Sequence, residues 1–258
     1  MSSLEFTGER IVPGKTAESL FRESQMRYAF AGRYAKGRVV LDVACGIGIG
    51  THCLLKAGGV RCIGLDLSLE AIRYAKFSYA GCTFAACDAT SLCLADQSVD
   101  LVVSFETIEH LTDPRKFLAQ CNRVLRPNGL LICSTPNREI SQWGPGNAFH
   151  VAEMKPGELL SLMEGYFVDC KLYGQHDVGY PSCVAKSIAV KLLDRTHLRS
   201  VVRRSVRRFK PLPLSGICTE TEFPEQDGRF PELAINPYIP KWQERPVYLL
   251  AIGRKQPN

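Results

Sequence analysis

The sequence contains no unbroken apolar run of about 18 residues, the length that a membrane-spanning helix requires. Its first residues, MSSLEFTGER, lack the apolar core of a signal peptide. None of its 11 cysteines has the CxxC spacing of a zinc ribbon or a thioredoxin-type motif. Cysteines inside apolar runs, such as Cys62, Cys133 and Cys170, are typical of a reduced interior. We therefore expect a cytoplasmic protein with free thiols and no spanning helix.

The composition is that of a globular enzyme, with 45% apolar and 22% charged residues among 258. A chain of this length buries a large core without disulfides or structural metals. The net charge of +6 is unevenly distributed, because residues 186–210 carry nine bases and one acid. The rest of the chain therefore has a net charge of −2, and the basic character belongs to one segment.

Short apolar runs that favour strands alternate with helical patterns along the chain. The expected strands are 38–42, 60–65, 82–87, 100–105, 130–135, 166–173 and 247–252. The clearest expected helices are 16–36, 114–125 and 155–164. This alternation predicts an α/β fold with a Rossmann-like, doubly wound parallel sheet. We expect a helical lid at 1–36, a core at 37–175, a basic and proline-rich insertion at 176–245, and a final strand and tail at 246–258.

Four successive strands end in an acid, namely Asp42, Asp66, Asp88 and Glu106. Ligands of open α/β sheets bind beyond the carboxyl ends of the strands. A row of carboxylates is therefore predicted along the ligand-binding edge of the sheet.

The turn after the first strand is rich in glycine and lacks the GxGxxG spacing of nicotinamide enzymes. Its glycines, Gly46 and Gly48 among them, let the backbone approach a ligand closely. A carboxylate at Asp42 disfavours a pyrophosphate there but favours a ligand with an ammonium and a sulfonium group. S-adenosylmethionine is such a ligand, and a nicotinamide oxidoreductase is disfavoured.

The expected cofactor contacts follow from these positions. Asp66 can accept hydrogen bonds from both ribose hydroxyls, with Leu67 packed on the adenine. Asp88 can accept from the adenine amino group, and the Ala89 amide can meet a ring nitrogen. On the first helix, Tyr28 and Arg27 can close over the cofactor, with Arg27 meeting its carboxylate. The full expected set is Arg27, Tyr28, Asp42, Ala44, Gly46, Gly48, Asp66, Leu67, Asp88, Ala89 and Phe105.

From about Gly37 to Thr135 the chain resembles the class I S-adenosylmethionine-dependent methyltransferases. The segments that carry the resemblance are LDVACGIGIG, IGLDLS, ACDAT, FETIEHL and RVLRPNGLLICSTPN. The resemblance implies a seven-stranded sheet with the last strand antiparallel, and S-adenosylhomocysteine as a product. One departure is Ala44, where many members have glycine, and it predicts a slightly crowded turn. The opening FTGERIVPG is similar to members associated with sugar, natural-product or cell-surface chemistry.

The segment Glu106-Thr-Ile-Glu109-His110 is similar to the ExxEH of ubiquinone-pathway O-methyltransferases. The resemblance implies that Glu106, Glu109 and His110 can hold a divalent metal. Alternatively, His110 is a general base or substrate contact, or the segment only packs and caps. His150, in a later loop, is a second candidate for the base, because imidazole suits proton removal near neutral pH. A hydroxyl acceptor needs such a base, whereas a neutral amine does not.

The basic segment 186–210 has the pattern of an amphipathic helix. It could contact an anionic membrane surface or a phosphorylated substrate, or it could be a solvated face over a core stripe. It lacks the interleaved aromatics that favour nucleic acid, and no motif indicates an oligomeric state. We therefore expect methyl transfer to an oxygen or nitrogen of a small, anionic, sugar-linked or lipid-linked acceptor. The alternative is a catalytically silent binding module that scaffolds a biosynthetic partner.

Overall fold

The computed structural model describes residues 11–12, 15–142, 147–175, 235–237 and 246–257. The expected insertion at 176–245 lies outside the described residues except for 235–237, and so does the basic segment 186–210. Within the described part of the chain, no helix is both long and apolar enough to span a bilayer.

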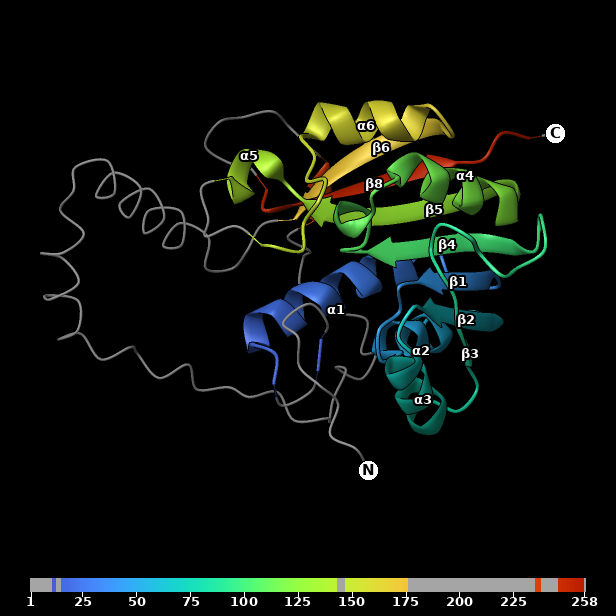
Figure 1. The fold of residues 1–258 in the computed structure, drawn as a ribbon. Helices are drawn as coiled ribbons and strands as arrows, with labels where there is room; N and C mark the ends of the chain where they lie inside the picture. Colours follow the sequence, from blue (N-terminus) through green and yellow to red (C-terminus); the bar gives the residue numbers. More distant parts are fainter. Residues whose placement is uncertain (1–10, 13–14, 143–146, 176–234, 238–245, 258) are drawn as a thin grey trace, which may run out of the picture.

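One mixed sheet forms the centre of the molecule (Figure 1). Its strands are β1 (Val39–Val43), β2 (Arg61–Asp66), β3 (Thr83–Ala86), β4 (Val99–Phe105), β5 (Leu125–Pro136), β6 (Val168–Gln175), β7 (Ile235–Pro237) and β8 (Tyr248–Arg254). Their order is β3-β2-β1-β4-β5-β8-β6-β7. Strand β8 is antiparallel to both neighbours, so the expected seven-stranded sheet with an antiparallel last strand is confirmed. The three-residue β7 is an addition that extends the edge beside β6.

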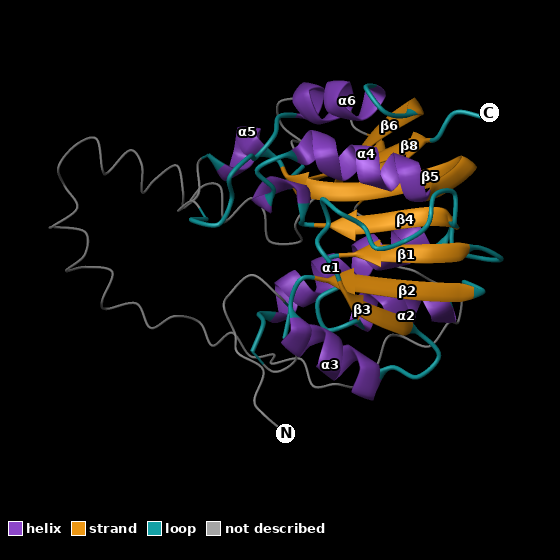
Figure 2. Ribbon diagram, turned by 45° about the vertical axis from the view of Figure 1, so that its right-hand side comes forward, coloured by secondary structure: helices purple, strands orange, loops and turns teal. Residues whose placement is uncertain are grey.

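Helices cover both faces of the sheet (Figure 2). They are α1 (Glu18–Gly32), α2 (Ile49–Lys56), α3 (Leu69–Ser78), α4 (Pro114–Val124), α5 (Arg138–Ser141) and α6 (Pro156–Glu164), with a 3-10 turn η1 at Ile108–His110. Helices α4 and α6 bury side chains such as Phe117 and Leu159 against one face. Helices α1 and α2 bury Phe30 and Leu54 against the other. This two-sided cover explains why the central strands are apolar throughout rather than alternating.

Two element boundaries differ from the sequence prediction by more than two residues. Helix α1 ends at Gly32 instead of residue 36, and the chain continues in turns to β1. Strand β5 begins at Leu125, before the expected turn at Pro127–Gly129. The reason is that backbone bonds join Asn128 and Gly129 to Lys255, which keeps this stretch in the sheet. Asn128 has the φ of +64° that a turn would use.

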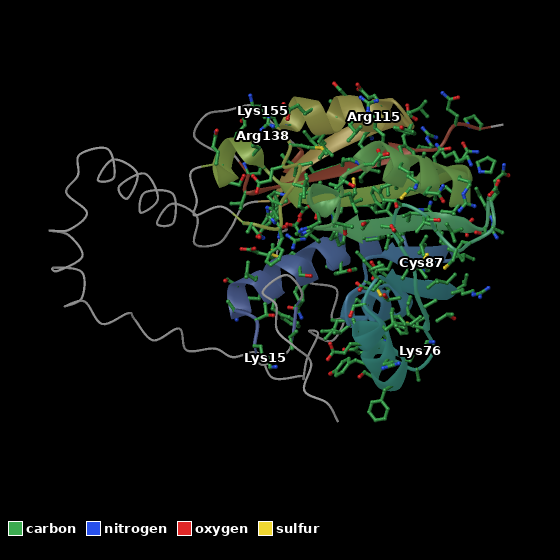
Figure 3. The ribbon with its side chains drawn as sticks, viewed as in Figure 1. Lys15, Lys76, Cys87, Arg115, Arg138 and Lys155 are labelled. Carbon is green, nitrogen blue, oxygen red and sulfur yellow. The ribbon has the colours of Figure 1, made fainter. Side chains whose placement is uncertain are left out.

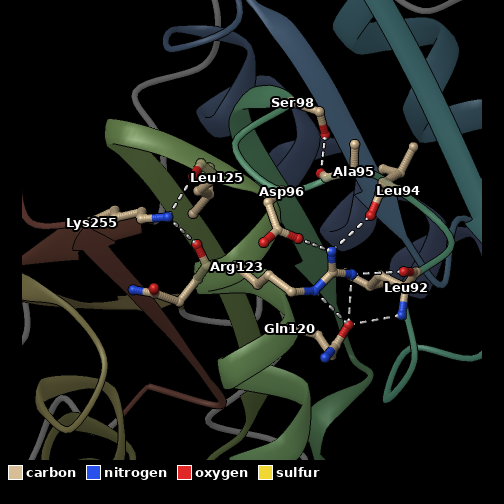
Figure 4. A network of polar contacts seen from close by, with 10 residues as sticks. Leu92, Leu94, Ala95, Asp96, Ser98, Gln120, Arg123, Leu125 and Lys255 are labelled. Carbon is tan, nitrogen blue, oxygen red and sulfur yellow. Dashed lines mark hydrogen bonds and ion pairs between the residues drawn. The ribbon is translucent and has the colours of Figure 1, made fainter. Parts of the chain in front are cut away.

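Away from the carboxyl edge of the sheet, Arg123 of α4 fastens the connection between β3 and β4 (Figure 4). Its guanidinium donates to the carbonyl oxygens of Leu92 and Leu94 and to the carboxylate of Asp96. Lys255 similarly donates to two carbonyls near the end of α4. The contacts of Arg123 satisfy the carbonyls of Leu92 and Leu94 in the connection between β3 and β4, so they hold this long connection in place.

Candidate active site

A cavity of about 690 Å³ opens at the carboxyl ends of β1, β2 and β4, with α1 along one side. Its size lies within the usual range for ligand sites, about 300–1,000 Å³. Residues from distant parts of the chain line it, including Arg27, Tyr28, Ala44, Gly46, Asp66, Leu67, Phe105, Glu106, Glu109, His110, His150, Glu153 and Tyr248. The cavity lies at the edge where the sequence predicts a row of acids.

The turn after β1 adopts the left-handed backbone that the glycines permit. Gly46 and Gly48 have φ of +55° and +87°, and the backbone N–H of Cys45 donates to Leu65 O in β2. Ala44 also has a positive φ, +59°, which is costly for a residue with a Cβ. The expected crowding at Ala44 is therefore a backbone effect at this turn.

Asp42 lies one residue before the end of β1 and is fully buried beneath the turn. It accepts hydrogen bonds from the Tyr28 hydroxyl at 3.1 Å and from Thr51 Oγ1 at 2.7 Å. Burial nevertheless raises the pKa of Asp42 to about 7. Tyr28 can approach because Gly50 has no side chain: a Cβ there would lie 1.9 Å from the ring Cζ. The sequence analysis did not single out Thr51 or Gly50.

Asp66 ends β2 and lines the cavity. Its carboxylate accepts the backbone N–H of Gly46 and that of Ser68, each at 2.8 Å. These two bonds fix the carboxylate and leave it further lone pairs that can accept hydrogen bonds. Leu67 follows at the rim of the cavity with 77% of its surface exposed, an open apolar surface beside Asp66.

Asp88 and Ala89 follow β3 but do not line the described cavity. The Asp88 carboxylate is exposed and accepts from the backbone N–H and the hydroxyl of Thr90. These bonds lower the pKa of Asp88. Figure 3 marks the neighbouring Cys87 on the same side of the molecule as α3. The structure therefore brings Asp42 and Asp66 together at the turn and leaves Asp88 outside the cavity.

Arg27 is 4% exposed, so it is not a solvated surface arginine, although its position on a helix suggests one. Its guanidinium donates to Gln175 Oε1 at 2.9 Å and lies over the Tyr248 ring at 4.5 Å. Its Nε has no hydrogen-bond partner among the described residues. Gln175 and Tyr248 were not expected from the sequence, because they come from strands far from Arg27 along the chain.

Phe105 ends β4 and packs edge-on against Tyr28, with ring centroids 5.0 Å apart. The next residue, Glu106, also has a left-handed backbone, with φ of +53°. Ser134 of β5 holds it in place: Ser134 Oγ donates to Glu106 Oε1 at 2.6 Å. Strained backbone of this kind concentrates at functional sites.

Glu109 is fully buried, and neither carboxylate oxygen has a hydrogen-bond partner among the described residues. Burial, followed by the nearby charge of Glu106, raises the pKa of Glu109 well above its usual value. Beside it, His110 Nε2 lies 3.9 Å from Glu109 Oε1. The ring of His150, from the loop after α5, meets the His110 ring at 5.0 Å between centroids. Both expected histidines therefore lie in one cluster with Glu109.

The partners of His150 were not predicted from the sequence. Its Nδ1 lies 2.6 Å from Glu153 Oε1, and its Nε2 lies 2.9 Å from the Asn147 amide. Ser141 Oγ donates to the other oxygen of Glu153. The spacing of Asn147, His150 and Glu153, each three residues apart, was the available signal, but a loop of this kind has no periodicity to support it.

Comparison with known proteins gives a consistent result. Residues 41–133 match the family described as "Methyltransferase domain". The chain is 35% identical over 213 residues to a protein of Mycolicibacterium smegmatis named "Probable S-adenosylmethionine-dependent methyltransferase", an alignment that covers 80% of this chain and 79% of that one. It is 34% identical over 124 residues to the "Ubiquinone biosynthesis O-methyltransferase" of Methylococcus capsulatus, which covers 46% of this chain and 52% of the relative.

Among solved structures, a SAM-dependent methyltransferase of Thermotoga maritima has a similar fold. The TM-score is 0.58 at 16% identity, and the match covers 91% of this chain and 90% of that one. At this identity the likeness concerns the fold. It supports the Rossmann-like sheet described above.

Proposed function

Because this chain belongs to the S-adenosylmethionine-dependent methyltransferases, we propose that its cavity holds that cofactor over the turn after β1 and transfers the methyl group to a hydroxyl of a small acceptor. The observation that carries the proposal is the convergence of two regions in one cavity. One is the turn with Asp42 and Asp66, and the other is the cluster of Glu109, His110 and His150.

The cofactor half of the cavity fits a cationic nucleoside. Asp66 is held by two backbone amides and can accept the ribose hydroxyls with its remaining lone pairs. Asp42 lies below the turn, where its ionised form attracts the sulfonium and ammonium groups. Arg27 lines the cavity, and its Nε, which has no hydrogen-bond partner among the described residues, is available to the cofactor carboxylate. Leu67 offers an exposed apolar surface for the adenine.

The acceptor half favours oxygen over nitrogen as the methylated atom. A neutral amine needs no base, whereas a hydroxyl must lose a proton during transfer. Two imidazoles, His110 and His150, line this end of the cavity together with Glu109. The expected anionic, sugar-linked or lipid-linked character of the acceptor depends on 186–210, so it stays a prediction.

In the reaction, a lone pair of the acceptor oxygen forms a bond to the methyl carbon while the carbon–sulfur bond breaks. The sulfonium becomes the neutral thioether of S-adenosylhomocysteine. When no metal ion is bound, the hydroxyl proton passes to His110 or His150. The cavity contributes chiefly by alignment, and good alignment is worth about 7–11 kcal/mol of the barrier.

The donor set at this end also fits a divalent metal, because Glu109 offers two buried oxygens, without a hydrogen-bond partner in the part of the chain that the structure describes, beside two imidazoles. Glu109, His110 and His150 would hold the ion. It would act as a Lewis acid that makes the acceptor hydroxyl easier to deprotonate.

The proposal is tested with a deuterated methyl donor and an extract that contains small hydroxylated acceptors. We expect mass spectrometry to find a product with the label on oxygen. Asp66→Ala should weaken S-adenosylhomocysteine binding by about 1–3 kcal/mol in calorimetry, because ribose hydroxyls lose their acceptor. Asp96→Ala, outside the cavity, is the matched control. Unchanged affinity in Asp66→Ala, or label found only on nitrogen, would contradict the proposal.

A further inference from the structure

Two cysteines meet at the start of the connection between β3 and β4. Cys87 directly follows β3, and the backbone N–H of Cys93 donates to Cys87 Sγ at 3.1 Å. Because an N–Cα bond is about 1.46 Å long, the Cα of Cys93 lies within about 4.6 Å of the Cys87 sulfur. The two residues are therefore close enough in space for a disulfide, which requires neighbouring Cα atoms.

The backbone of each cysteine is held by a different part of the fold. The N–H of Cys87 donates to Asp66 O at 3.0 Å, which ties Cys87 to the end of β2. On each side of Cys93, the neighbouring residue has a carbonyl oxygen that accepts from the Arg123 guanidinium (Figure 4). These contacts keep the pair together without any bond between the two sulfur atoms.

The two side chains interact, and they differ in exposure. Cys93 is the one exposed cysteine among those that the structure describes, whereas Cys87 is half-buried. Burial, followed by a hydrogen bond with the Cys93 side chain, raises the pKa of Cys87 to about 11. Cys87 is therefore a protonated thiol near neutral pH, and Cys93 is the sulfur that an oxidant in solution meets first.

The Cys87 thiol also holds the loop that separates the pair. Its Sγ–H donates to Ser91 O at 3.4 Å. The same loop carries Asp88, whose carboxylate accepts from Thr90 and lies outside the cavity. A contact between Asp88 and the adenine of the cofactor therefore requires this loop to move.

We propose that Cys87 and Cys93 form a reversible disulfide on exposure to peroxide, and that this cross-link lowers the affinity of the cavity for the cofactor. The disulfide ties the two ends of the loop together, so it opposes the movement that brings Asp88 to the adenine. It also removes the Sγ–H that Cys87 donates to Ser91 O. The effect on affinity rests on the proposed function, whereas the disulfide itself does not.

The oxidation takes place in two steps. The Cys93 sulfur attacks one oxygen of hydrogen peroxide, so that the O–O bond breaks, one water leaves and Cys93 becomes a sulfenic acid. The Cys87 sulfur then attacks the Cys93 sulfur. The S–S bond forms, the S–O bond breaks, and the hydroxyl leaves as a second water with the Cys87 proton. Two thiols are oxidised while peroxide gains two electrons, and exchange with an added thiol reverses the change.

The first experiment treats the full-length, reduced protein with hydrogen peroxide and maps its disulfides by alkylation and peptide mass spectrometry. We expect a link between Cys87 and Cys93 that dithiothreitol reverses. Cys93→Ser should lack this link, and so should Cys87→Ser, which keeps a hydrogen-bond donor in the loop. Cys170→Ser, which changes a half-buried thiol of β6, is the matched control and should form the link as the unmodified protein does.

The second experiment measures S-adenosylhomocysteine affinity by calorimetry before and after peroxide treatment. Oxidation should weaken binding to the unmodified protein by about three- to tenfold, the usual effect of losing one hydrogen bond. Dithiothreitol should restore the affinity. Reduced Cys93→Ser should bind as the reduced unmodified protein does, and peroxide should leave its affinity unchanged.

Absence of the link between Cys87 and Cys93 after peroxide treatment overturns the proposal. So does a link that leaves the affinity unchanged, or a loss of affinity that Cys93→Ser shares, because either result separates this pair from cofactor binding. A reduced protein that does not bind S-adenosylhomocysteine contradicts the proposed function and the effect on affinity with it. The peptide map reports on the disulfide separately, so the two failures are distinguishable.

Discussion

At the scale of single residues, Asp42 connects the fold to cofactor binding. It is fully buried, and burial raises its pKa to about 7 although Tyr28 and Thr51 donate hydrogen bonds to it. In the ligand-free protein near neutral pH, Asp42 is therefore partly protonated. A cationic ligand favours the ionised form, so binding and proton release are coupled.

The affinity for S-adenosylmethionine should consequently rise as the pH rises from 5 to about 7, by up to about tenfold per pH unit, and then level off. Adenosine, which lacks the sulfonium and ammonium groups, is the control and should bind with little pH dependence. Calorimetry in buffers of different ionisation enthalpy measures both affinity and released protons. An affinity for the methyl donor that is constant over this range would contradict the assignment of Asp42.

Ala44 is the second informative residue, because its φ of +59° is a conformation that favours glycine. Ala44→Gly should raise the free energy of unfolding by about 0.5–1 kcal/mol and leave cofactor affinity nearly unchanged. Ala75→Gly, the same change in helix α3, should instead lower stability by about 1 kcal/mol. Urea denaturation of the three proteins measures both effects. If both variants are less stable than the unmodified protein, the Ala44 methyl group contributes more to the free energy of unfolding than the positive φ costs.

The strand-end residues of the site were predictable, and their partners were not. Asp42, Asp66 and the histidines follow expected strands or lie in short polar segments, so sequence position locates them. Gln175, Tyr248 and Glu153 reach the site through folding of distant segments, which no local pattern records. Asp88 occupies an expected position, but Thr90 holds its carboxylate in a local turn outside the cavity.

At the scale of elements, helix α1 forms one wall of the cavity because Tyr28 passes over Gly50 of α2. The Tyr28 hydroxyl reaches Asp42, and its ring packs against Phe105. The position of the helix therefore depends on the absence of a single methyl group. The sequence predicts the helix and the glycine-rich turn, but it does not predict that Tyr28 of the helix packs directly on Gly50.

Gly50→Ala should place its Cβ within the Tyr28 ring, so that α1 shifts at a cost of about 1–3 kcal/mol. Cofactor affinity should fall with it, because the hydrogen bond to Asp42 is lost. Gly50→Ala combined with Tyr28→Ala removes the clash and should recover part of the stability that the single change loses. Thermal unfolding and calorimetry check these results. A Gly50→Ala protein with unaltered affinity would show that α1 can move freely.

At the scale of the whole molecule, the cavity lowers the stability of the ligand-free protein. Asp42 and Glu109 are both buried, and the pKa of each is raised. The folded state then binds their protons more tightly than the unfolded state does. The contribution of these carboxyl groups to the free energy of unfolding is fully present below the pKa values that they have in the unfolded chain. It is lost as the pH rises towards the pKa values that they have in the folded protein.

The free energy of unfolding should therefore fall between pH 5 and pH 7, by up to about 1.4 kcal/mol per pH unit for Asp42. Asp42→Asn cannot ionise and should show a shallower decline. The difference between the two curves isolates this residue from all other titrating groups. Denaturant titrations at each pH measure it, and parallel curves would mean that Asp42 is already ionised in the ligand-free fold.

The overall architecture was the most predictable level, since alternating strands and helices leave few ways to build a parallel sheet. The antiparallel last strand came from the family resemblance, since the apolar run at 247–252 does not state its direction. The early start of β5 was missed, because its pairing with Lys255 is a long-range contact.

The placement of β8 between β5 and β6 has a consequence for biosynthesis. While the ribosome is still translating the residues before 248, β5 and β6 have no partner between them, and each presents an open edge. Val247 and Tyr248, which line the cavity, are also missing from the nascent chain. Until the closing strand emerges, the growing chain therefore exposes two unpaired strand edges of the kind that promote aggregation, and its cavity lacks part of its lining.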